Sequence, residues 1–425
     1  MGVNSHTPQF VYCGELTPIA SEAMARAIYY NIFAYSHVKP TLSLVRELVL
    51  RGDEIIYYGT PELRDEIERT GATYRECLPP DPSPPPYWNP ILGAHHLLRQ
   101  AEHLLPRLLE EARRDQPTYI LHDTMCWWGR CIALILGLPC VTSFTTIAFQ
   151  PDLARQMGYA PKWRQVLAAP RALWESFRVV QRLNRKHQLF ASTRAALDAL
   201  LGKGTLNVVH IHRELQPMVE ELDDSYHFVG PDLVEPVGDP DFPMESLVDH
   251  KVVYIATGSI ATNRPAFYRL CLEAFAGCGF RVVMSVGNKL DLETLGPIPS
   301  NCMVFPFVPQ FSVLRHCDLF LTHCGMGSIS EGLYHGVPFL LDPQTPEQHL
   351  VAEQVMALGV GSRLKPEDLH PRRLARRVDE LLDDQQLYAA SRSVAESMRG
   401  SGNLKCAVDR ILEMTRPPER IDTRN

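Results

Sequence analysis

The chain has 425 residues, of which 45% are hydrophobic and 21% are charged, as expected of a soluble globular protein. Its length exceeds that of one ordinary hydrophobic core and therefore predicts two domains. The net charge of -7 argues against a nucleic-acid partner, because such a partner requires a basic face.

Cysteine usage and the apolar stretches favour a protein of the cytoplasm. The eleven cysteines are scattered and include no Cys-x-x-Cys pair, which favours free buried thiols over a disulfide framework. Residues 1–20 contain polar and acidic side chains throughout, so we predict no secretory signal. The longest apolar stretch, 131–141, is too short to span a bilayer, and we expect no membrane insertion.

The N-terminal half alternates short β-like runs with amphipathic helical runs from residue 26 onward. Such alternation predicts a mostly parallel sheet with helices on both faces. Strands are predicted at 27–33, 55–58, 119–121 and 139–141, and helices at 42–51, 61–70 and 127–136. Two segments lie outside this pattern. Residues 1–23 carry no motif and are of unknown order, whereas 79–90 contains seven prolines and is typical of a surface loop.

A change of pattern at 229–247 divides the chain. Four prolines lie between 230 and 243 without a sustained period, which predicts an extended linker. The alternation restarts at 251–256 and continues to about residue 382. We therefore predict an α/β fold of two Rossmann-like, doubly wound parallel-sheet domains, 24–228 and 248–425, that face a cleft. The last helix of the second domain can return to the first.

The segment 320–331, Phe-Leu-Thr-His-Cys-Gly-Met-Gly-Ser-Ile-Ser-Glu, is the most informative part of the chain. An apolar run at 319–321 predicts a buried strand, and a helical pattern begins at Ile329 after a loop of small residues. Backbone N–H groups in the loop and first helical turn lack intrahelical partners, and the helix dipole favours negative charge there. His323 and Ser328 add side-chain donors. The segment therefore predicts a site for a phosphate or diphosphate.

These residues resemble the UDP-glycosyltransferase superfamily, specifically its bacterial macrolide or antibiotic glycosyltransferase branch, which has the GT-B fold. The resemblance extends from about residue 24 to about residue 414. Its ordered signature is Phe307-Val308-Pro309-Gln310, Thr322-His323-Cys324-Gly325-Met326-Gly327-Ser328, Glu331, Gly336-Val337-Pro338 and Glu347-Gln348. An ordered series over roughly forty positions is far more specific than a lone glycine loop.

The resemblance implies that the second domain binds a nucleotide sugar and that the first binds the acceptor. His323 and Ser328 would bind the donor diphosphate. Glu331 would accept hydrogen bonds from the ribose hydroxyls, since a carboxylate has acceptors and no donor. The small-residue loop at Gly258 and Ser259 would approach the donor and the cleft.

Glu347 and Gln348 would hold sugar hydroxyls, although Glu347 could simply begin a helix after Pro346. The remaining donor-binding residues that the resemblance implies are Phe307, Val308, Gln310, Gly325, Met326 and Gly327. Two of them depart from the family pattern. Gly327 stands where the family usually has Asn, and Phe307 stands where plant members have a Trp.

In the first domain, residues 34–40 resemble the family's Gly-His-x-x-Pro. His37 is expected between the first strand and its helix, aimed at the cleft, with Pro40 in an opening helical turn. The positive end of that helix would disfavour imidazolium and keep His37 neutral. Asp123 ends another predicted strand and matches the family's acidic partner, although alone it could also cap a helix. As a partner it would fix the tautomer of His37.

The reaction that the resemblance implies is an inverting transfer that needs neither a metal nor a cofactor. His37 would deprotonate an acceptor hydroxyl, which attacks the anomeric carbon of a hexose on UDP or dTDP. The acceptor would be a hydrophobic small molecule such as a natural product. The Asp-x-Asp sequence at 239–241 lies in the presumed linker. Candidate acceptor-binding residues are Tyr87, Trp88, Trp127 and Phe144, with core packing an equal alternative for Trp127.

Other functions are compatible with the same scaffold. A nucleotide-sugar epimerase would not need the His37–Asp123 pair. A lipid-sugar transferase would need a hydrophobic or basic membrane-facing patch, of which the acidic composition gives no sign. A catalytically silent partner protein would bind a nucleotide sugar without transfer, and Gly327 leaves this alternative open. The sequence is compatible with a monomer or a homodimer.

Overall fold

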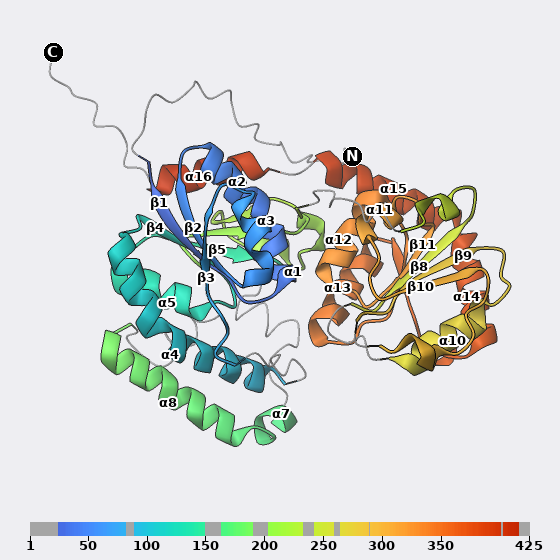
Figure 1. The fold of residues 1–425 in the computed structure, drawn as a ribbon, viewed down its shortest axis with the longest axis horizontal. Helices are drawn as coiled ribbons and strands as arrows, with labels where there is room; N and C mark the ends of the chain where they lie inside the picture. Colours follow the sequence, from blue (N-terminus) through green and yellow to red (C-terminus); the bar gives the residue numbers. More distant parts are fainter. Residues whose placement is uncertain are drawn as a thin grey trace, which may run out of the picture.

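The computed structural model describes residues 24–81, 89–148, 163–189, 203–232, 242–258, 264–288, 290–400 and 403–415. It contains two parallel β-sheets with helices packed on them, and Figure 1 shows the two resulting domains side by side. Among the helices of these residues, none is long and apolar enough to cross a bilayer. The predicted segment 1–23 and residues 233–241 of the predicted linker lie outside the described residues.

The N-terminal domain is built on a seven-stranded sheet with the order β3-β2-β1-β4-β5-β6-β7. Its strands are β1 (Arg26–Tyr30), β2 (Glu54–Gly59), β3 (Thr73–Glu76), β4 (Tyr119–Asp123), β5 (Cys140–Phe144), β6 (Leu206–Val209) and β7 (Tyr226–Phe228). Its helices are α1 (Tyr35–Val38), α2 (Leu42–Leu50), α3 (Arg64–Glu68), α4 (Pro90–Asp115), α5 (Trp127–Leu136), α7 (Trp163–Leu167) and α8 (Pro170–His187). Short 3-10 turns connect several of these elements.

Alternation along the strands supplies a core on each face of this sheet. Ile28 and Tyr30 point to the face that is covered by α4, α5 and α8. Ala27 and Tyr29 point to the opposite face, where α2 and α3 pack. Because both faces are covered, the central strands are almost entirely buried.

The C-terminal domain is built on a six-stranded sheet with the order β10-β9-β8-β11-β12-β13. Its strands are β8 (Val252–Ala256), β9 (Arg281–Ser285), β10 (Cys302–Phe305), β11 (Leu319–Thr322), β12 (Phe339–Leu341) and β13 (Gly361–Arg363). Its helices are α10 (Pro265–Phe275), α11 (Gln310–Leu314), α12 (Met326–His335), α13 (Pro346–Ala357), α14 (Pro371–Leu382) and α15 (Gln385–Gly400). Helices α10 and α14 cover one face, and α11, α12 and α13 cover the other.

In both sheets the strand order reverses beside the first strand of the domain. β1 lies between β2 and β4, and β8 lies between β9 and β11. In an open α/β sheet, the carboxyl ends of the strands at such a reversal form the crevice where ligands bind. His37 follows β1 and Asp123 ends β4, whereas Gly258 follows β8 and His323 follows β11. Each pair of predicted site residues therefore lies at the crevice of its own sheet.

The final helix, α16 (Leu404–Thr415), returns to the N-terminal domain and packs against α2 and β7. Figure 1 shows it in red beside α2, at the upper edge of the N-terminal domain, whereas α15 lies at the upper edge of the C-terminal domain. Ala407, Val408 and Ile411 are fully buried in the core of that domain. An ion pair of 2.5 Å between Arg51 and Asp409 fixes the helix to the end of α2.

Most predicted elements are present, and two boundaries differ in an informative way. The helix at 127–136 is confirmed without change. The first strand ends at Tyr30 rather than at Phe33. α12 begins at Met326, three residues before the predicted start, because Gly325 is its N-cap and buried Met326 already occupies its first turn. Gly327 and Ser328 had obscured this turn, since small residues give no apolar period.

Candidate active site

His37 and Asp123 contact each other directly, although 86 residues separate them. The Nδ1 atom of His37 lies 2.8 Å from Oδ2 of Asp123. The other carboxylate oxygen of Asp123 accepts a hydrogen bond of 2.8 Å from the backbone N–H of Met125. Asp123 is fully buried, and 17% of the His37 side chain is exposed. The acid is therefore held inside the domain, and the imidazole retains access to solvent.

The contact determines which ring nitrogen is available for chemistry. A carboxylate only accepts hydrogen bonds, so the neutral His37 ring places its proton on Nδ1 and leaves the lone pair of Nε2 unprotonated. The hydroxyl of Thr145 lies 2.9 Å from the same Nδ1. This arrangement is suited to proton abstraction at Nε2.

The electrostatic environment of His37 differs from the expectation. Burial by itself lowers the pKa of His37, but the carboxylates of Asp123 and Glu347 outweigh it, and the pKa lies above its usual value. We had expected the positive end of a following helix to keep the ring neutral. His37 instead lies inside the short helix α1, and the neighbouring negative charges dominate.

Two residues that the sequence analysis did not single out complete this part of the site. Thr145 and Thr146 directly follow β5, which is paired with β4 so that Ser143 lies opposite Asp123. Thr145 contacts His37, and Thr146 donates a hydrogen bond of 2.5 Å to Oε1 of Glu347 in the other domain. Two threonines at the carboxyl end of a buried strand were the signal that could have revealed them.

On the C-terminal side, the N-terminus of α12 has the predicted form of an anion site. Gly325 is the N-cap and provides no side chain to accept from the first-turn N–H groups. Cys324, which precedes it, has a positive φ of 66° and turns the chain sharply from β11 into the helix. The N–H groups of the first turn therefore remain available for an anionic ligand.

The His323 imidazole fits closely between two glycines beside this helix end. A Cβ atom at Gly258 would lie 2.4 Å from Nε2 of His323, and one at Gly325 would lie 2.5 Å from it. Gly258 also has a φ of +82°, which disfavours any side chain. Burial lowers the pKa of His323 to about 4, so the ring is neutral at physiological pH. Its Nδ1 is buried without a hydrogen-bond partner among the described residues.

Glu331 is the centre of a polar network that joins the domains. Its Oε1 accepts from Nζ of Lys39 at 2.9 Å, and its Oε2 accepts from the amide of Gln310 at 2.7 Å. The hydroxyl of Ser328 donates a hydrogen bond of 3.4 Å to Oε1, the side-chain amide oxygen of Gln310. Only 10% of the Glu331 side chain is exposed. Three predicted donor-binding residues are thus brought together, and Lys39 from the opposite domain completes the cluster.

The next acid–amide pair begins α13. Thr345 and Gln348 form a reciprocal capping box, in which the carbonyl oxygen of the Gln348 side chain accepts from the backbone N–H groups of Gln344 and Thr345. Glu347 lies in the first turn, where a negative charge is stabilised by the helix dipole. The helix-capping alternative is therefore present in the structure, and Glu347 also faces the other domain through Thr146.

The remaining predicted donor-binding residues differ in how far they are exposed to solvent. Phe307 has 68% of its surface exposed, whereas Val308 and Met326 are buried in the core cluster. A ligand would therefore reach Val308 and Met326 mainly through their backbone. A Cβ atom at Gly327 would meet no atom within 4 Å, so there is room for the usual Asn. Ser259 lies outside the described residues.

The candidate acceptor residues are buried or outside the described residues. Trp127 is 6% exposed and packs in the core between α4 and α5, and Phe144 is 1% exposed and packs near Tyr226. Burial favours a packing role for both, which for Trp127 is the alternative stated above, and whether either contacts an acceptor stays a prediction. Tyr87 and Trp88 lie outside the described residues. His122, beside Asp123 on β4, is buried and shares a hydrogen bond with Thr142 on the neighbouring strand β5.

Comparison with known proteins agrees with this architecture. Residues 270–414 match the family model of the C-terminal domain of erythromycin biosynthesis protein CIII-like proteins. The chain is 30% identical to oleandomycin glycosyltransferase of Streptomyces antibioticus over 404 residues, which cover 91% of this chain and 90% of that protein. It is 29% identical to the uncharacterised UDP-glucosyltransferase YojK of Bacillus subtilis, with 92% and 97% covered.

A solved structure has the same fold over nearly the whole chain. The glycosyltransferase of kitacinnamycin is 28% identical and has a TM-score of 0.81, covering 92% of this chain and 99% of that one. The two sheets and these similarities agree with one another. The chain is a glycosyltransferase with the GT-B fold and belongs to the UDP-glycosyltransferase superfamily, in its bacterial macrolide and antibiotic branch.

Proposed function

We propose that the protein transfers a hexose, with inversion, from a UDP or dTDP sugar to a hydroxyl of a hydrophobic natural-product acceptor. One observation carries this proposal. The two segments that build the base site, 37–39 and 145–146, each also contact a carboxylate of the C-terminal domain. Lys39 and Thr146 therefore bring the imidazole of His37 to face the residues expected to hold ribose and sugar.

The first proposed step is removal of the acceptor proton. Nε2 of His37 takes the proton of the acceptor hydroxyl as its oxygen attacks the anomeric carbon from the face opposite the diphosphate. Asp123 stabilises the imidazolium that forms and holds the ring in position. General-base catalysis of this kind contributes roughly a factor of 10² to 10⁴ in rate.

The second proposed contribution is stabilisation of the departing diphosphate. Its negative charge would lie against the first-turn N–H groups of α12, with His323 beside them as a neutral donor. Glu331 would hold the ribose and Glu347 the sugar. The first-turn N–H groups of α12 and His323 would stabilise the negative charge of the diphosphate, a task that a divalent metal performs in other enzymes. We therefore propose that transfer needs no divalent metal and persists when metals are chelated.

The similarity to proteins named UDP-glucosyltransferase and oleandomycin glycosyltransferase supports this choice of substrates. Direct support would come from incubating the protein with UDP-glucose or dTDP-glucose and a panel of macrolide and polyketide aglycones. Mass spectrometry should then detect an aglycone that has gained one hexose. NMR of the product should show the anomeric configuration opposite to that of the donor.

The same experiment separates the alternatives. Interconversion of sugar epimers that is unchanged in His37→Ala would identify an epimerase. Binding of nucleotide sugars without a product for any acceptor would identify a silent partner protein. Either result, obtained with a folded protein, would contradict the proposed transfer.

A further inference from the structure

The outer surface of the N-terminal domain contains an apolar and basic patch that the overall acidic composition conceals. It lies on α7 and α8, and Figure 1 shows α8 beyond α4 along the lower edge of the N-terminal domain, with α7 at the end nearer to the C-terminal domain. We define the α8 patch as Leu167, Leu173, Trp174 and Phe177 together with Arg171, Arg178 and Arg182. A net charge of -7 summed over the whole chain gives no sign of this local surface.

The apolar part of the α8 patch is a second hydrophobic face on a helix that already has one. Val179, Val180 and Leu183 are the buried face and pack toward α4 and α5. Leu173, Trp174 and Phe177 lie on a different side, at spacings that make them neighbours on a helix. They are 40%, 57% and 43% exposed, and Leu167 at the end of α7 is 68% exposed. Contiguous exposed apolar side chains of this size indicate an interaction surface.

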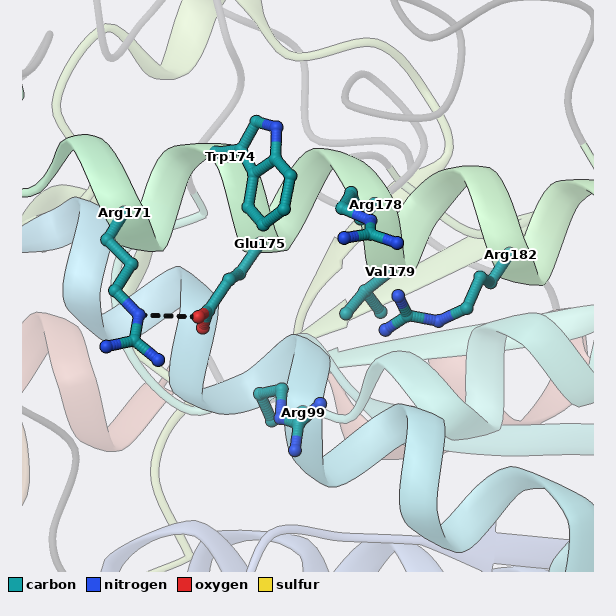
Figure 2. A pocket seen from close by; sticks show the side chains of 7 residues that line it. All are labelled: Arg99, Arg171, Trp174, Glu175, Arg178, Val179 and Arg182. Carbon is teal, nitrogen blue, oxygen red and sulfur yellow. Dashed lines mark hydrogen bonds and ion pairs between the residues drawn. The ribbon is translucent and has the colours of Figure 1, made fainter.

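The basic part surrounds a cavity of about 340 Å³ between α4 and α8. Figure 2 shows that Arg171, Arg178 and Arg182 reach it from α8 and that Arg99 reaches it from α4. The guanidinium of Arg178 stacks on the Trp174 ring at 4.6 Å, so the cationic and apolar groups adjoin one another directly.

Acidic neighbours neutralise this cavity only in part. Glu175 pairs with Arg171 at 2.7 Å. Glu102 is shared, accepting from Arg182 at 2.7 Å and from Arg99 at 3.1 Å. Among the residues that the structure describes, four guanidinium groups therefore face two carboxylates, which leaves an excess of positive charge on a chain whose net charge is -7. Such a local excess attracts an anionic partner.

We propose that the α8 patch docks the protein on the surface of an anionic phospholipid bilayer. Phospholipids combine an anionic head with apolar chains in one molecule, which is the combination that the arginine-lined cavity and the adjoining apolar face complement. A helix with Trp, Phe and Leu beside Arg residues is typical of helices that lie in the membrane interface. The helix would lie along the surface without crossing the bilayer. Docking would place the N-terminal domain, and with it His37, on the side of the molecule nearest to membrane-dissolved hydrophobic compounds.

Vesicle sedimentation tests this directly and measures binding alone, so its outcome does not depend on the proposed glycosyl transfer. The full chain is mixed with vesicles of phosphatidylcholine, or of phosphatidylcholine with 30–40% phosphatidylglycerol, at about 0.1 M salt. We expect binding to the anionic vesicles only, with a blue shift of tryptophan fluorescence. Binding should weaken as the salt concentration rises.

Two variants test the basic and the apolar residues of the α8 patch separately. The variant Arg171→Gln/Arg178→Gln/Arg182→Gln should bind anionic vesicles about a hundredfold more weakly, since each basic residue near an anionic surface contributes roughly a factor of five. Trp174→Ala/Phe177→Ala should lose binding to a similar degree. Two matched controls lie away from the patch, and their parent side chains are also exposed. One is Arg372→Gln/Arg373→Gln/Arg376→Gln on α14 of the C-terminal domain. The other is Leu50→Ala/Leu369→Ala, with Leu50 on α2, across the N-terminal sheet from α8, and Leu369 in the C-terminal domain. Both controls should bind as the parent does.

Equal sedimentation with neutral vesicles, no sedimentation with either, or unchanged binding by both patch variants would overturn the proposal. The proposal would also be overturned if the α8 patch bound a second copy of the chain. In that case the parent protein would be a dimer by light scattering, and the Trp174→Ala/Phe177→Ala variant would be a monomer. Circular dichroism and the melting temperature establish that each variant is folded.

Discussion

Nζ of Lys39 and Oε1 of Glu331 lie 2.9 Å apart and form an ion pair between the two domains. Lys39 is two residues from the candidate base, and Glu331 is the carboxylate proposed for the ribose. A nucleotide that uses this carboxylate must share it with the ammonium group or displace it. If Glu331 holds the ribose as proposed, entry of the donor is coupled to a contact between the two domains.

Removing the Lys39 side-chain charge should strengthen binding of the free nucleoside. In Lys39→Met the competing ion pair, worth about 1 kcal/mol when partly exposed, is absent, so we expect roughly fivefold tighter binding of uridine or thymidine. The nucleoside diphosphate should gain less, because the ammonium that attracts its charge is also lost. Calorimetry with both ligands measures the two effects. Lys39→Arg, which keeps the pair, is the control, and weaker nucleoside binding by the Met variant contradicts the interpretation.

Replacing Asp123 with Asn should lower the transfer rate by roughly 10² to 10⁴ and change its pH dependence. His37 acts as a base only when neutral, so activity rises with pH through its pKa. Burial lowers this pKa and Asp123 raises it above the usual value. Without the carboxylate the pKa falls, and the acid limb of the kcat/KM profile should move to lower pH. An acid limb at the same pH in both proteins would exclude His37 as the titrating base.

Glu347→Gln should affect the sugar more than the nucleotide. We expect the variant to bind the nucleoside diphosphate as the parent does and the complete nucleotide sugar more weakly, by about tenfold for one charged hydrogen bond. The acid limb should also move to lower pH, because the charge of Glu347 contributes to the raised pKa of His37. Thermal shifts with both ligands and a pH profile provide the measurements. Equal weakening for both ligands would place Glu347 away from the sugar.

Gly325, the N-cap of α12, and Gly327, in its first turn, should respond in opposite ways to substitution. Gly325→Ala places a Cβ atom 2.5 Å from Nε2 of His323 and must displace the ring, so we expect diphosphate binding to weaken at least tenfold. Gly327→Asn meets no atom within 4 Å and restores the residue usual in the family, so binding should be retained or improved. Calorimetry with the nucleoside diphosphate compares them. Equal tolerance of both changes would mean that the His323 ring does not contact the diphosphate.

The sequence was sufficient to predict features that lie within a single domain. Strand–helix alternation identified both sheets, and residues at strand ends identified His37, Asp123 and His323, because carboxyl ends of parallel strands share one edge. The direction of the pKa shift of His37 was wrong. It depends on the distances to Asp123 and Glu347, and the second of these lies in the other domain.

Contacts between the two domains could not be predicted from the sequence pattern. Lys39 and Thr146 are ordinary polar residues in their own segments, and only the orientation of the domains gives them partners. The α8 patch could not be predicted from the sequence for a different reason. A net charge summed over the chain hides an arginine-rich helix face, and apolar residues on two sides of a helix resemble a single broad core face.

The return of α16 to the N-terminal domain means that the polypeptide crosses between the domains twice, once before β8 and once after α15. Two connections restrict rotation of one domain against the other more than a single connection does. A chain shortened before residue 404 would keep every residue of the candidate site and still lose this restriction. It would also expose the apolar surface of α2 that Val408 and Ile411 now cover.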